Sequence, residues 1–356
     1  MPPEILSRYV ELLASHPWNS GTLYALGLEA RAELERARAG LASLLGAQPS
    51  ELVFTSGGTE ANNLAVHACA GATSGGSAWV SSTAHPSLAN PLRGLRDRGW
   101  RLWELPVTVS GALAVDPLGT LEKPDLVAVE WVNNELGFVQ PLEALLDEVA
   151  RRAPRARVIV DGVQGFAKLP TPKLDRLHAF SLGAHKIGGP PGCGALLLHG
   201  FPEPRPLMFG GGQEGGWRPG TVAVPAVAAF LAAAQRARGL AAPPWPGEVF
   251  SGAAPKPLRD PATPYSPYIW TLDTSPVEGE VLMHHLEAKD IVIGLGSACS
   301  SHKRGLSPAH RAAGLSEHQS RRTLRVSFAP GQPASEVAGA LAALVVEWRA
   351  LLRYFN

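Results

Sequence analysis

The stretch V-I-V-D-G-V-Q-G, residues 158–165, decides the fold class of this sequence. Val158–Val160 is a run of β-branched residues, typical of a strand buried on both faces of a parallel sheet. Asp161 follows at the carboxyl end of that strand, where open α/β sheets bind their ligands. A carboxylate in this place needs a cation or strong donors, such as a protonated pyridine nitrogen. The alternative is that Asp161 only caps the next helix.

Further apolar runs on both sides alternate with stretches of helical length and period, such as Ala61–Ala70 and Pro141–Arg152. Strands that alternate with helices predict an α/β domain with a mainly parallel, seven-stranded sheet. The expected strands are Leu52–Thr55, Ala78–Ser81, Leu102–Leu105, Leu126–Trp131, Val158–Val160, Ala179–Leu182 and Ala195–Leu198.

The sequence changes in character after the buried helix that we expect at Thr221–Ala234. Residues Arg238–Pro267 are rich in proline, glycine and alanine, which indicates a domain boundary or linker. The elements predicted beyond it form a smaller α+β domain: strand Tyr268–Leu272, helix Glu278–Lys289, a strand near Leu324–Phe328 and a helix from about Ala334.

Composition excludes several classes of protein. The 356 residues carry 32 basic and 31 acidic side chains without a basic block, so neither nucleic acid nor a membrane is indicated as a partner. The three cysteines form no C-x-x-C pair, so we expect neither a disulfide framework nor a cysteine-based metal site. The first residues resemble an amphipathic helix and no signal peptide, and the apolar run Val337–Val346 is too short to span a bilayer. We therefore expect a soluble cytoplasmic protein.

Two further motifs carry chemistry. In F-T-S-G-G-T-E-A-N-N-L-A, residues 54–65, two glycines join a strand to a helix start whose amides, with the Thr59 hydroxyl, suit a phosphate. An ordinary capped turn is the alternative, and the nucleotide-binding G-x-x-x-x-G-K-[ST] pattern is absent.

Lys186 follows a strand and precedes a Gly-Pro-rich turn, where its amine can form a Schiff base; the alternative is an exposed loop lysine. A phosphate-binding turn, an acidic residue such as Asp161 and a lysine such as Lys186 follow one another along the chain in this order. This order is expected of a pyridoxal phosphate site.

The sequence resembles the cysteine desulfurases, which belong to the class V aminotransferase group of fold-type-I pyridoxal-phosphate enzymes. The likeness runs from about Asn19 to Phe328. The matching stretches are T-S-G-G-T-E-A-N-N (55–63), V-N-N-E-L-G (132–137), V-D-G-V-Q (160–164), H-K-I-G-G-P (185–190), G-G-G-Q-E (210–214), R-P-G-T (218–221) and G-S-A-C-S-S (296–301). The resemblance implies a large cofactor-binding domain at 13–240. It also implies a small domain, formed by 1–12 and 241–356, that carries the Cys299 loop.

The resemblance further implies a role for each matching residue. Lys186 binds the cofactor and moves the substrate's Cα proton, and the other ring contacts come from Asp161 at the nitrogen, His85 by stacking and Gln164 at the ring oxygen. Asn134 lies beside the ring oxygen and the substrate carboxylate, and Arg325 binds this carboxylate. The phosphate is held by Gly58, Thr59, His185 and, from the second subunit of a homodimer, Thr221.

Cys299 lies in a stretch of glycine, serine and alanine, 296–301, where a thiol has little to pack against. The bland interpretation is a surface loop with an incidental cysteine. The resemblance implies instead that Cys299 takes sulfur from L-cysteine as a persulfide, releases L-alanine and passes the sulfur to an acceptor or scaffold protein for iron–sulfur clusters or thio-cofactors. Small residues provide the mobile tether that this transfer needs. A base or cation must help to form the thiolate, and we expect it among residues 302–304.

The sequence also departs from the family's pattern. Gly183 stands where a phosphate-binding serine is usual, Ala84 replaces an acid, and Gly215 and Pro219 interrupt a glycine-rich run. The Asp-Asn-Ala-Ala-Thr-Thr-like segment with which members usually open would precede Met1. Two alternatives therefore stay open. One is another class V enzyme, namely a selenocysteine lyase, an aminotransferase or a β-lyase; the other is a degenerate, non-catalytic paralogue that only binds a partner.

Overall fold

The protein is described here from a computed structural model that covers residues 1–15, 18–108, 111–242, 244–296 and 306–355. The chain forms two compact units, each built from three segments. The large unit comprises Met1–Glu104, Pro117–Trp131 and Leu142–Gly239, and the small unit comprises Leu105–Asp116, Val132–Pro141 and Leu240–Asn356.

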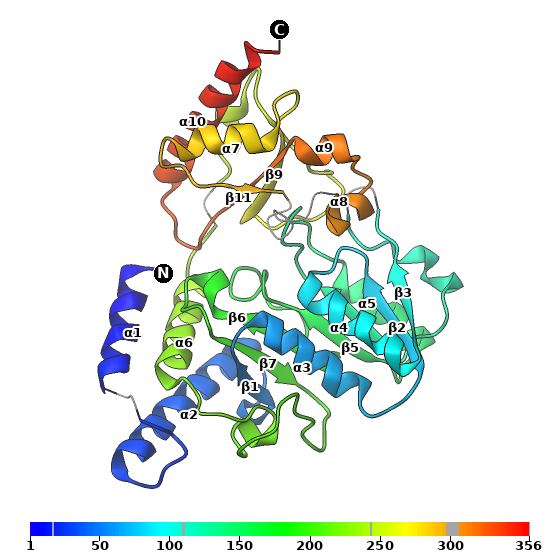
Figure 1. The fold of residues 1–356 in the computed structure, drawn as a ribbon, viewed down its shortest axis with the longest axis vertical. Coiled ribbons are helices and arrows are strands. Elements are labelled where there is room, and N and C mark those ends of the chain that lie inside the picture. The colour runs from blue at the N-terminus through cyan, green and yellow to red at the C-terminus, as the bar shows by residue number, and fades with distance from the viewer. Residues whose placement is uncertain (16–17, 109–110, 243, 297–305, 356) are drawn as a thin grey trace. The chain divides into compact units, whose positions relative to one another are not determined.

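A seven-stranded sheet, with the strand order β1-β7-β6-β5-β4-β2-β3, forms the centre of the large unit (Figure 1). Strands β2, β4, β5 and β6 pair in parallel, whereas β7 is antiparallel to both of its neighbours, β6 and β1. The prediction of a mainly parallel, seven-stranded sheet is therefore confirmed. The strands are β1 (Leu52–Thr55), β2 (Gly76–Ser81), β3 (Trp100–Leu105), β4 (Leu126–Glu130), β5 (Arg157–Asp161), β6 (Ala179–Gly183) and β7 (Gly194–Leu198).

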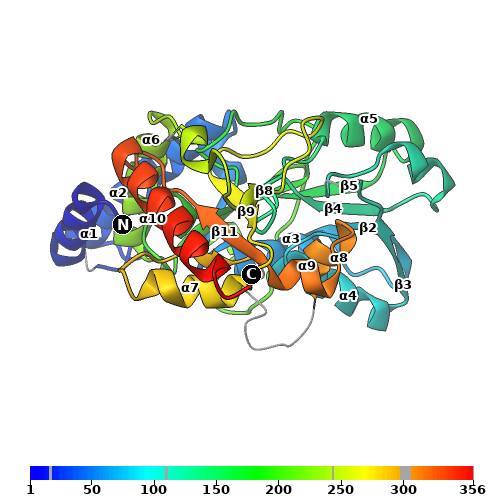
Figure 2. The ribbon, with the colours of Figure 1, turned by 90° about the horizontal axis from the view of Figure 1, so that it is seen from above.

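Helices cover both faces of this sheet, as the strands' nearly continuous apolar sequences require. Figure 2 shows α3 and α4 on one side of β4 and β5, with α5 on the other. Alternate strand residues such as Val80, Ala128 and Ile159 pack with Leu64 of α3 and Leu88 of α4 in one buried cluster. The helices of this unit are α1 (Pro3–Ser15), α2 (Ala25–Leu45), α3 (Gly58–Ala70), α4 (Pro86–Gly94), α5 (Leu142–Arg152) and α6 (Val224–Arg238).

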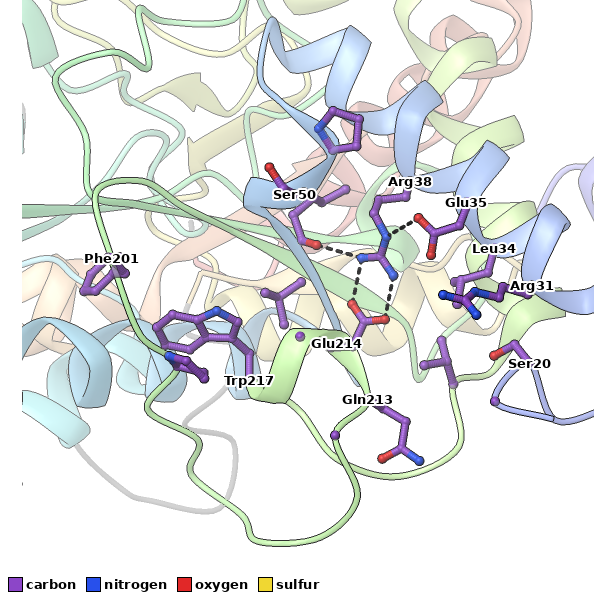
Figure 3. A pocket seen from close by; sticks show the side chains of 18 of the residues that line it. Ser20, Arg31, Leu34, Glu35, Arg38, Ser50, Phe201, Gln213, Glu214 and Trp217 are labelled. Carbon is purple, nitrogen blue, oxygen red and sulfur yellow. Dashed lines mark hydrogen bonds and ion pairs between the residues drawn. The ribbon is translucent and has the colours of Figure 1, made fainter. Parts of the chain in front are cut away.

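A buried ion pair joins α2 to the glycine-rich segment after β7. The Arg38 guanidinium donates to both carboxylate oxygens of Glu214, at 2.8 and 2.7 Å, and to the Leu52 carbonyl at 2.7 Å. Glu214 also accepts the Phe54 N–H at 2.7 Å, and its side chain is only 1% exposed. Figure 3 shows this pair at the wall of a hollow of about 780 Å³. One charge pair therefore connects α2, β1 and the 3-10 turn Glu214–Gly216.

The small unit has its own antiparallel sheet, with the strand order β10-β11-β9-β8. Its core gathers side chains from this sheet and from α7 and α10, such as Leu272, Leu324, Leu282 and Leu341. The elements are β8 (Lys256–Pro257), β9 (Ile269–Asp273), α7 (Gly279–Glu287), β10 (Gly294–Leu295), α8 (Pro308–Ala312), α9 (Glu317–Arg321), β11 (Thr323–Ser327) and α10 (Ala334–Leu352).

The proline-rich segment that we expected as a boundary or linker belongs to the small unit from Leu240 onward. Trp245 stacks on Trp270 of β9, with ring centroids 3.7 Å apart and planes inclined by 9°. The Arg259 guanidinium lies 3.3 Å from the Trp270 ring centroid. These stacked rings and the cation are the contacts by which a segment without long helices or strands packs on its sheet.

The two compact units differ from the predicted domains in two respects: residues 105–116 and 132–141, expected in the large domain, group with the small unit, and α1 groups with the large unit. We expected residues 1–12 with the small domain, but α1 lies against α6 in the large unit, where Arg236 donates to Glu4 at 2.5 Å. The domain limits themselves stay a prediction. In the described part of the chain, no helix has both the length and the apolar character needed to cross a membrane.

Arg38→Met tests the importance of the buried ion pair. We expect the free energy of unfolding of the large unit to fall by about 3–5 kcal/mol, because Glu214 would stay buried without its cation. Urea unfolding followed by circular dichroism measures this loss. Arg93→Met is the matched control: its side chain is 47% exposed and its partner Glu104 is 58% exposed, so its loss should stay near 0–1 kcal/mol, as is typical of surface pairs. Equal losses for the two variants would contradict the anchoring role of the pair.

Candidate active site

Asp161 ends β5 with its carboxylate buried and surrounded by donors. It is 7% exposed, and its carboxylate accepts hydrogen bonds from Asn62 Nδ2 at 2.8 Å, the Val163 N–H at 3.0 Å and Ser181 Oγ at 3.4 Å. The bond from Val163 is the local turn contact expected of a capping residue. The bonds from α3 and β6 go beyond capping, and they hold a negative charge in a defined orientation at the carboxyl end of the sheet.

A chain of hydrogen bonds leads from Asp161 to His85. Asn62 Nδ2 also contacts Ser87 Oγ at 2.9 Å, and Ser87 Oγ lies 2.7 Å from His85 Nδ1. The Ser87 N–H donates to the same ring nitrogen at 3.1 Å, so His85 caps the start of α4. Burial lowers the pKa of His85, Asp161 opposes this shift, and the positive charge of Lys186 adds to it. His85 is therefore a neutral imidazole whose Nδ1 accepts, and its environment includes both Asp161 and Lys186.

Lys186 lies in the 3-10 turn Ala184–Ile187 that follows β6. Its charge reaches two other basic groups. Burial and then Lys186 lower the pKa of Lys168 to about 7, and burial, Lys186 and Lys168 lower the pKa of His185. Three basic groups at one place disfavour each other's charged forms, a cost that a bound anion would remove.

The start of α3 provides amides for such an anion. Gly57 precedes the helix with a φ of 152°, and a Cβ on Gly194 of β7 would lie 2.6 Å from the Gly57 Cα, so glycine at 194 permits this close packing. The first amides of a helix have no partner within it. Gly58 and Thr59 occupy this first turn, and Thr59 and His85 line one hollow of about 530 Å³.

Asn134 and Arg325 meet in the small unit. Arg325 of β11 donates from Nη1 to the Asn134 carbonyl at 3.0 Å. The segment that carries Asn134 lies between β4 and α5 in sequence, yet Thr271 of β9 donates to the Glu135 carbonyl at 2.6 Å and Ser266 donates to the Gly137 carbonyl at 2.7 Å. The first of these donors is the Thr271 hydroxyl and the second is the Ser266 N–H, and together they attach this motif to the small unit.

The other predicted residues are placed as follows. Gln164 lies in the turn after β5 and accepts from Lys168 Nζ at 3.2 Å. Thr221 is exposed, directly after Gly220 with its φ of 101°. Gly183 ends β6, where a Cβ would lie 3.3 Å from a Val163 methyl. Cys299 and the basic residues 302–304 lie outside the described residues.

Three residues of this region, Asn62, Ser87 and Lys168, are not marked as site residues by any motif of the sequence. Asn62 could have been found from its position in α3, because the other residues on the buried face of this helix, such as Ala61 and Ala65, are small or apolar. A buried amide in such a stripe needs polar partners. Ser87 and Lys168 have no comparable signal, because their importance depends on segments that are distant in sequence.

The sequence matches the model of the aminotransferase class-V family over residues 1–237. A NifS/IcsS protein homolog from Lactobacillus delbrueckii is 34% identical over 319 residues, which are 85% of this chain and 83% of that protein. The human cysteine desulfurase is 32% identical over 353 residues, with 91% and 74% covered. Among solved structures, DndA from Streptomyces lividans superposes with a TM-score of 0.73 at 29% identity and covers 92% of this chain and 97% of its own. A NifS-like protein, at 23% identity and a TM-score of 0.84, shares the fold and covers 97% and 95%.

Asn62→Leu tests the hydrogen-bond chain. We expect the free energy of unfolding to fall by about 1–3 kcal/mol, because Asp161 and Ser87 each lose the donor from Asn62. Urea unfolding measures the loss. The neighbouring Asn63→Leu is the control, since the Asn63 side chain bonds only to the Thr59 carbonyl at an exposed position in the described structure. If both variants lose the same stability, the chain from Asp161 to His85 is not held by Asn62.

Proposed function

The chain belongs to the aminotransferase class-V family, and from this premise we propose that it is a cysteine desulfurase, which takes sulfur from L-cysteine and releases L-alanine. The family's cofactor is pyridoxal phosphate, and the enzyme depends on it. The observation that carries the proposal is that the charges of Asp161 and Lys186 both act on the pKa of His85. Asp161 ends β5 and Lys186 follows the end of β6.

The residues of the large unit fit this cofactor. Lys186 lowers the pKa of Lys168 and of His185, a repulsion that a bound phosphate would offset, and the first turn of α3 offers amides to such an anion. The negative charge of Asp161 suits the positive charge of a protonated ring nitrogen. Asn62 Oδ1 is a buried acceptor without a hydrogen-bond partner in the described structure, which leaves room for one more donor beside Asp161. Acidic and basic groups are thus both present for a zwitterionic aromatic cofactor.

Each of these side chains then has a distinct task. The cofactor, when bound, withdraws electrons from the substrate's α-carbon. Lys186 holds the cofactor covalently and, once released, moves the Cα proton with its amine. Asp161 would keep the ring nitrogen protonated, neutral His85 would contact the ring, and Gln164 would bond the ring oxygen. Phosphate oxygens are held by Gly58, Thr59 and His185.

The substrate carboxylate binds to Arg325, with Asn134 beside it. The hydrogen bond from Nη1 to the Asn134 carbonyl supports this assignment, because it holds the Arg325 guanidinium beside Asn134. Cys299 then attacks the sulfur of L-cysteine as a thiolate. A new S–S bond forms and the substrate C–S bond breaks. The bonding electrons stay with carbon, which takes up a proton and leaves as L-alanine, so the step needs no external oxidant.

The sulfur then passes from Cys299 to an acceptor or scaffold protein that supplies iron–sulfur clusters or thio-cofactors. We propose a homodimer, in which Thr221 reaches the phosphate of the partner's site. The exposed position of Thr221 supports this, as does the apolar stretch Leu207–Phe209 in the same loop, where Phe209 is 94% exposed. A cytoplasmic location fits the free thiols of Cys69 and Cys193.

Cys299→Ala tests the activity. In the wild type we expect L-cysteine to give L-alanine and one persulfide per chain, which mass mapping places on the Cys299 peptide. The variant should form no persulfide and lose alanine formation by about a hundredfold or more. Cys193→Ala is the control, because burial raises the pKa of the Cys193 thiol to about 12 and makes it unreactive.

Two outcomes would redirect the proposal. If Cys299→Ala releases sulfide from L-cysteine at the wild-type rate, the chain is another class V enzyme. Borohydride reduction of the purified protein should attach the cofactor to the Lys186 peptide. A protein that carries no such label and no cofactor absorption band would be a non-catalytic member of the family.

A further inference from the structure

Lys168 is a basic residue to which the reaction described above assigns no task. It ends the turn after β5, in which the N–H groups of Gly165 and Phe166 donate to the Gly162 carbonyl, and that of Lys168 donates to the Gly165 carbonyl. Ala167 has a φ of 57°, in the left-handed region that residues other than glycine rarely adopt. This backbone outlier lies directly before Lys168, and outliers of this kind concentrate at functional sites.

The Lys168 amine contacts one of the proposed cofactor ligands. Its Nζ lies 3.2 Å from Gln164 Oε1. An ammonium group has three donors and no acceptor, so this contact occupies the oxygen of the Gln164 carboxamide. The Gln164 NH₂ group is then the part of this side chain that is available to a further partner. Such a group donates, and it therefore favours the deprotonated form of an oxygen that it meets.

The charge of Lys168 also acts on its neighbours. Lys186 and burial lower the pKa of Lys168 to about 7, and Lys168 in turn contributes to the lowered pKa of His185. An acidic group of the same environment, Asp161, raises the pKa of His85, whereas Lys186 lowers it. Coupling between two titrating groups is reciprocal, so a charged Lys168 makes a charge on the nitrogen of Lys186 less favourable.

We propose that Lys168 is a positioning residue for pyridoxal phosphate. It turns the Gln164 carboxamide so that its NH₂ group donates to the ring oxygen, and in its protonated form its positive charge favours the unprotonated form of the nitrogen that links Lys186 to the cofactor. This inference rests on the proposed function, since it takes from it the roles of Gln164 and Lys186. Both effects act in one direction: they lower the pH at which the linking nitrogen loses its proton.

A series of three proteins tests the proposal through the spectrum of the bound cofactor. The absorption of the cofactor-loaded protein is titrated with base in the wild type, Lys168→Met and Lys168→Arg. The Met side chain keeps most of the length and removes the donor and the charge, so we expect the midpoint to rise by about 0.5–1 pH unit. Arginine stays charged at every pH of the titration, so its midpoint should lie at or below that of the wild type.

Lys173→Met is the matched control, because Lys173 is an exposed lysine five residues further along the same connection. Its midpoint should equal that of the wild type. If Lys168→Met does not fold, as judged by circular dichroism, Lys168→Gln replaces it with the same expected shift, and the wild-type and arginine proteins complete the series.

The results separate this proposal from the proposed function. Equal midpoints in all variants, in a wild type that binds the cofactor at Lys186, would refute the role of Lys168 and leave the desulfurase activity standing. A wild type without bound cofactor would refute the proposed function itself. A midpoint order of Met above wild type, with Arg at or below it, supports the positioning role, because a purely structural effect of the substitutions would not follow their charge.

Discussion

The buried carboxylate of Asp161 is the constraint on which the arrangement of the large unit's site depends. A charge in this place must be surrounded by donors, and the most distant of them in sequence, Asn62, comes from α3. The same Asn62 nitrogen contacts Ser87, at the start of α4. One amide therefore links β5, α3 and α4. This link fixes the position of α3, whose first turn suits a phosphate, relative to the end of β5, where Asp161 suits a ring nitrogen.

The basic side chains impose a second constraint. Lys186 lowers the pKa of both Lys168 and His185, and Lys168 also lowers that of His185, so these three basic side chains share one environment. In an ordinary folded region such a cluster would be dispersed, because it costs stability. In a site for a phosphate ester it is useful. The unprotonated amine is the form of lysine that attacks an aldehyde, and the anion restores the charge balance after binding.

The small unit shows that order in sequence and membership of a unit need not agree. The V-N-N-E-L-G motif follows β4 of the large sheet directly, but β9 and the segment before it take up its backbone hydrogen bonds. Gly137, with a φ of 79°, makes this possible, since a Cβ there would lie 2.5 Å from the Ile269 carbonyl oxygen. Asn134 is thereby placed with Arg325, although 191 positions separate the two in the chain, and both belong to the proposed binding of the substrate carboxylate.

The sequence by itself determined the seven strands, their alternation with helices and the positions of Asp161, Lys186 and the start of α3. These features follow from patterns within about ten residues, namely β-branched runs, helical periodicity and glycine turns. It did not determine that Asn62 serves Asp161 across 99 positions, that the motif at 132–137 joins the small unit, or that Lys168 shares the surroundings of Lys186. Only the tertiary structure decided these points, because hydrogen-bond partners, burial and the coupling of charges depend on which distant segments pack together.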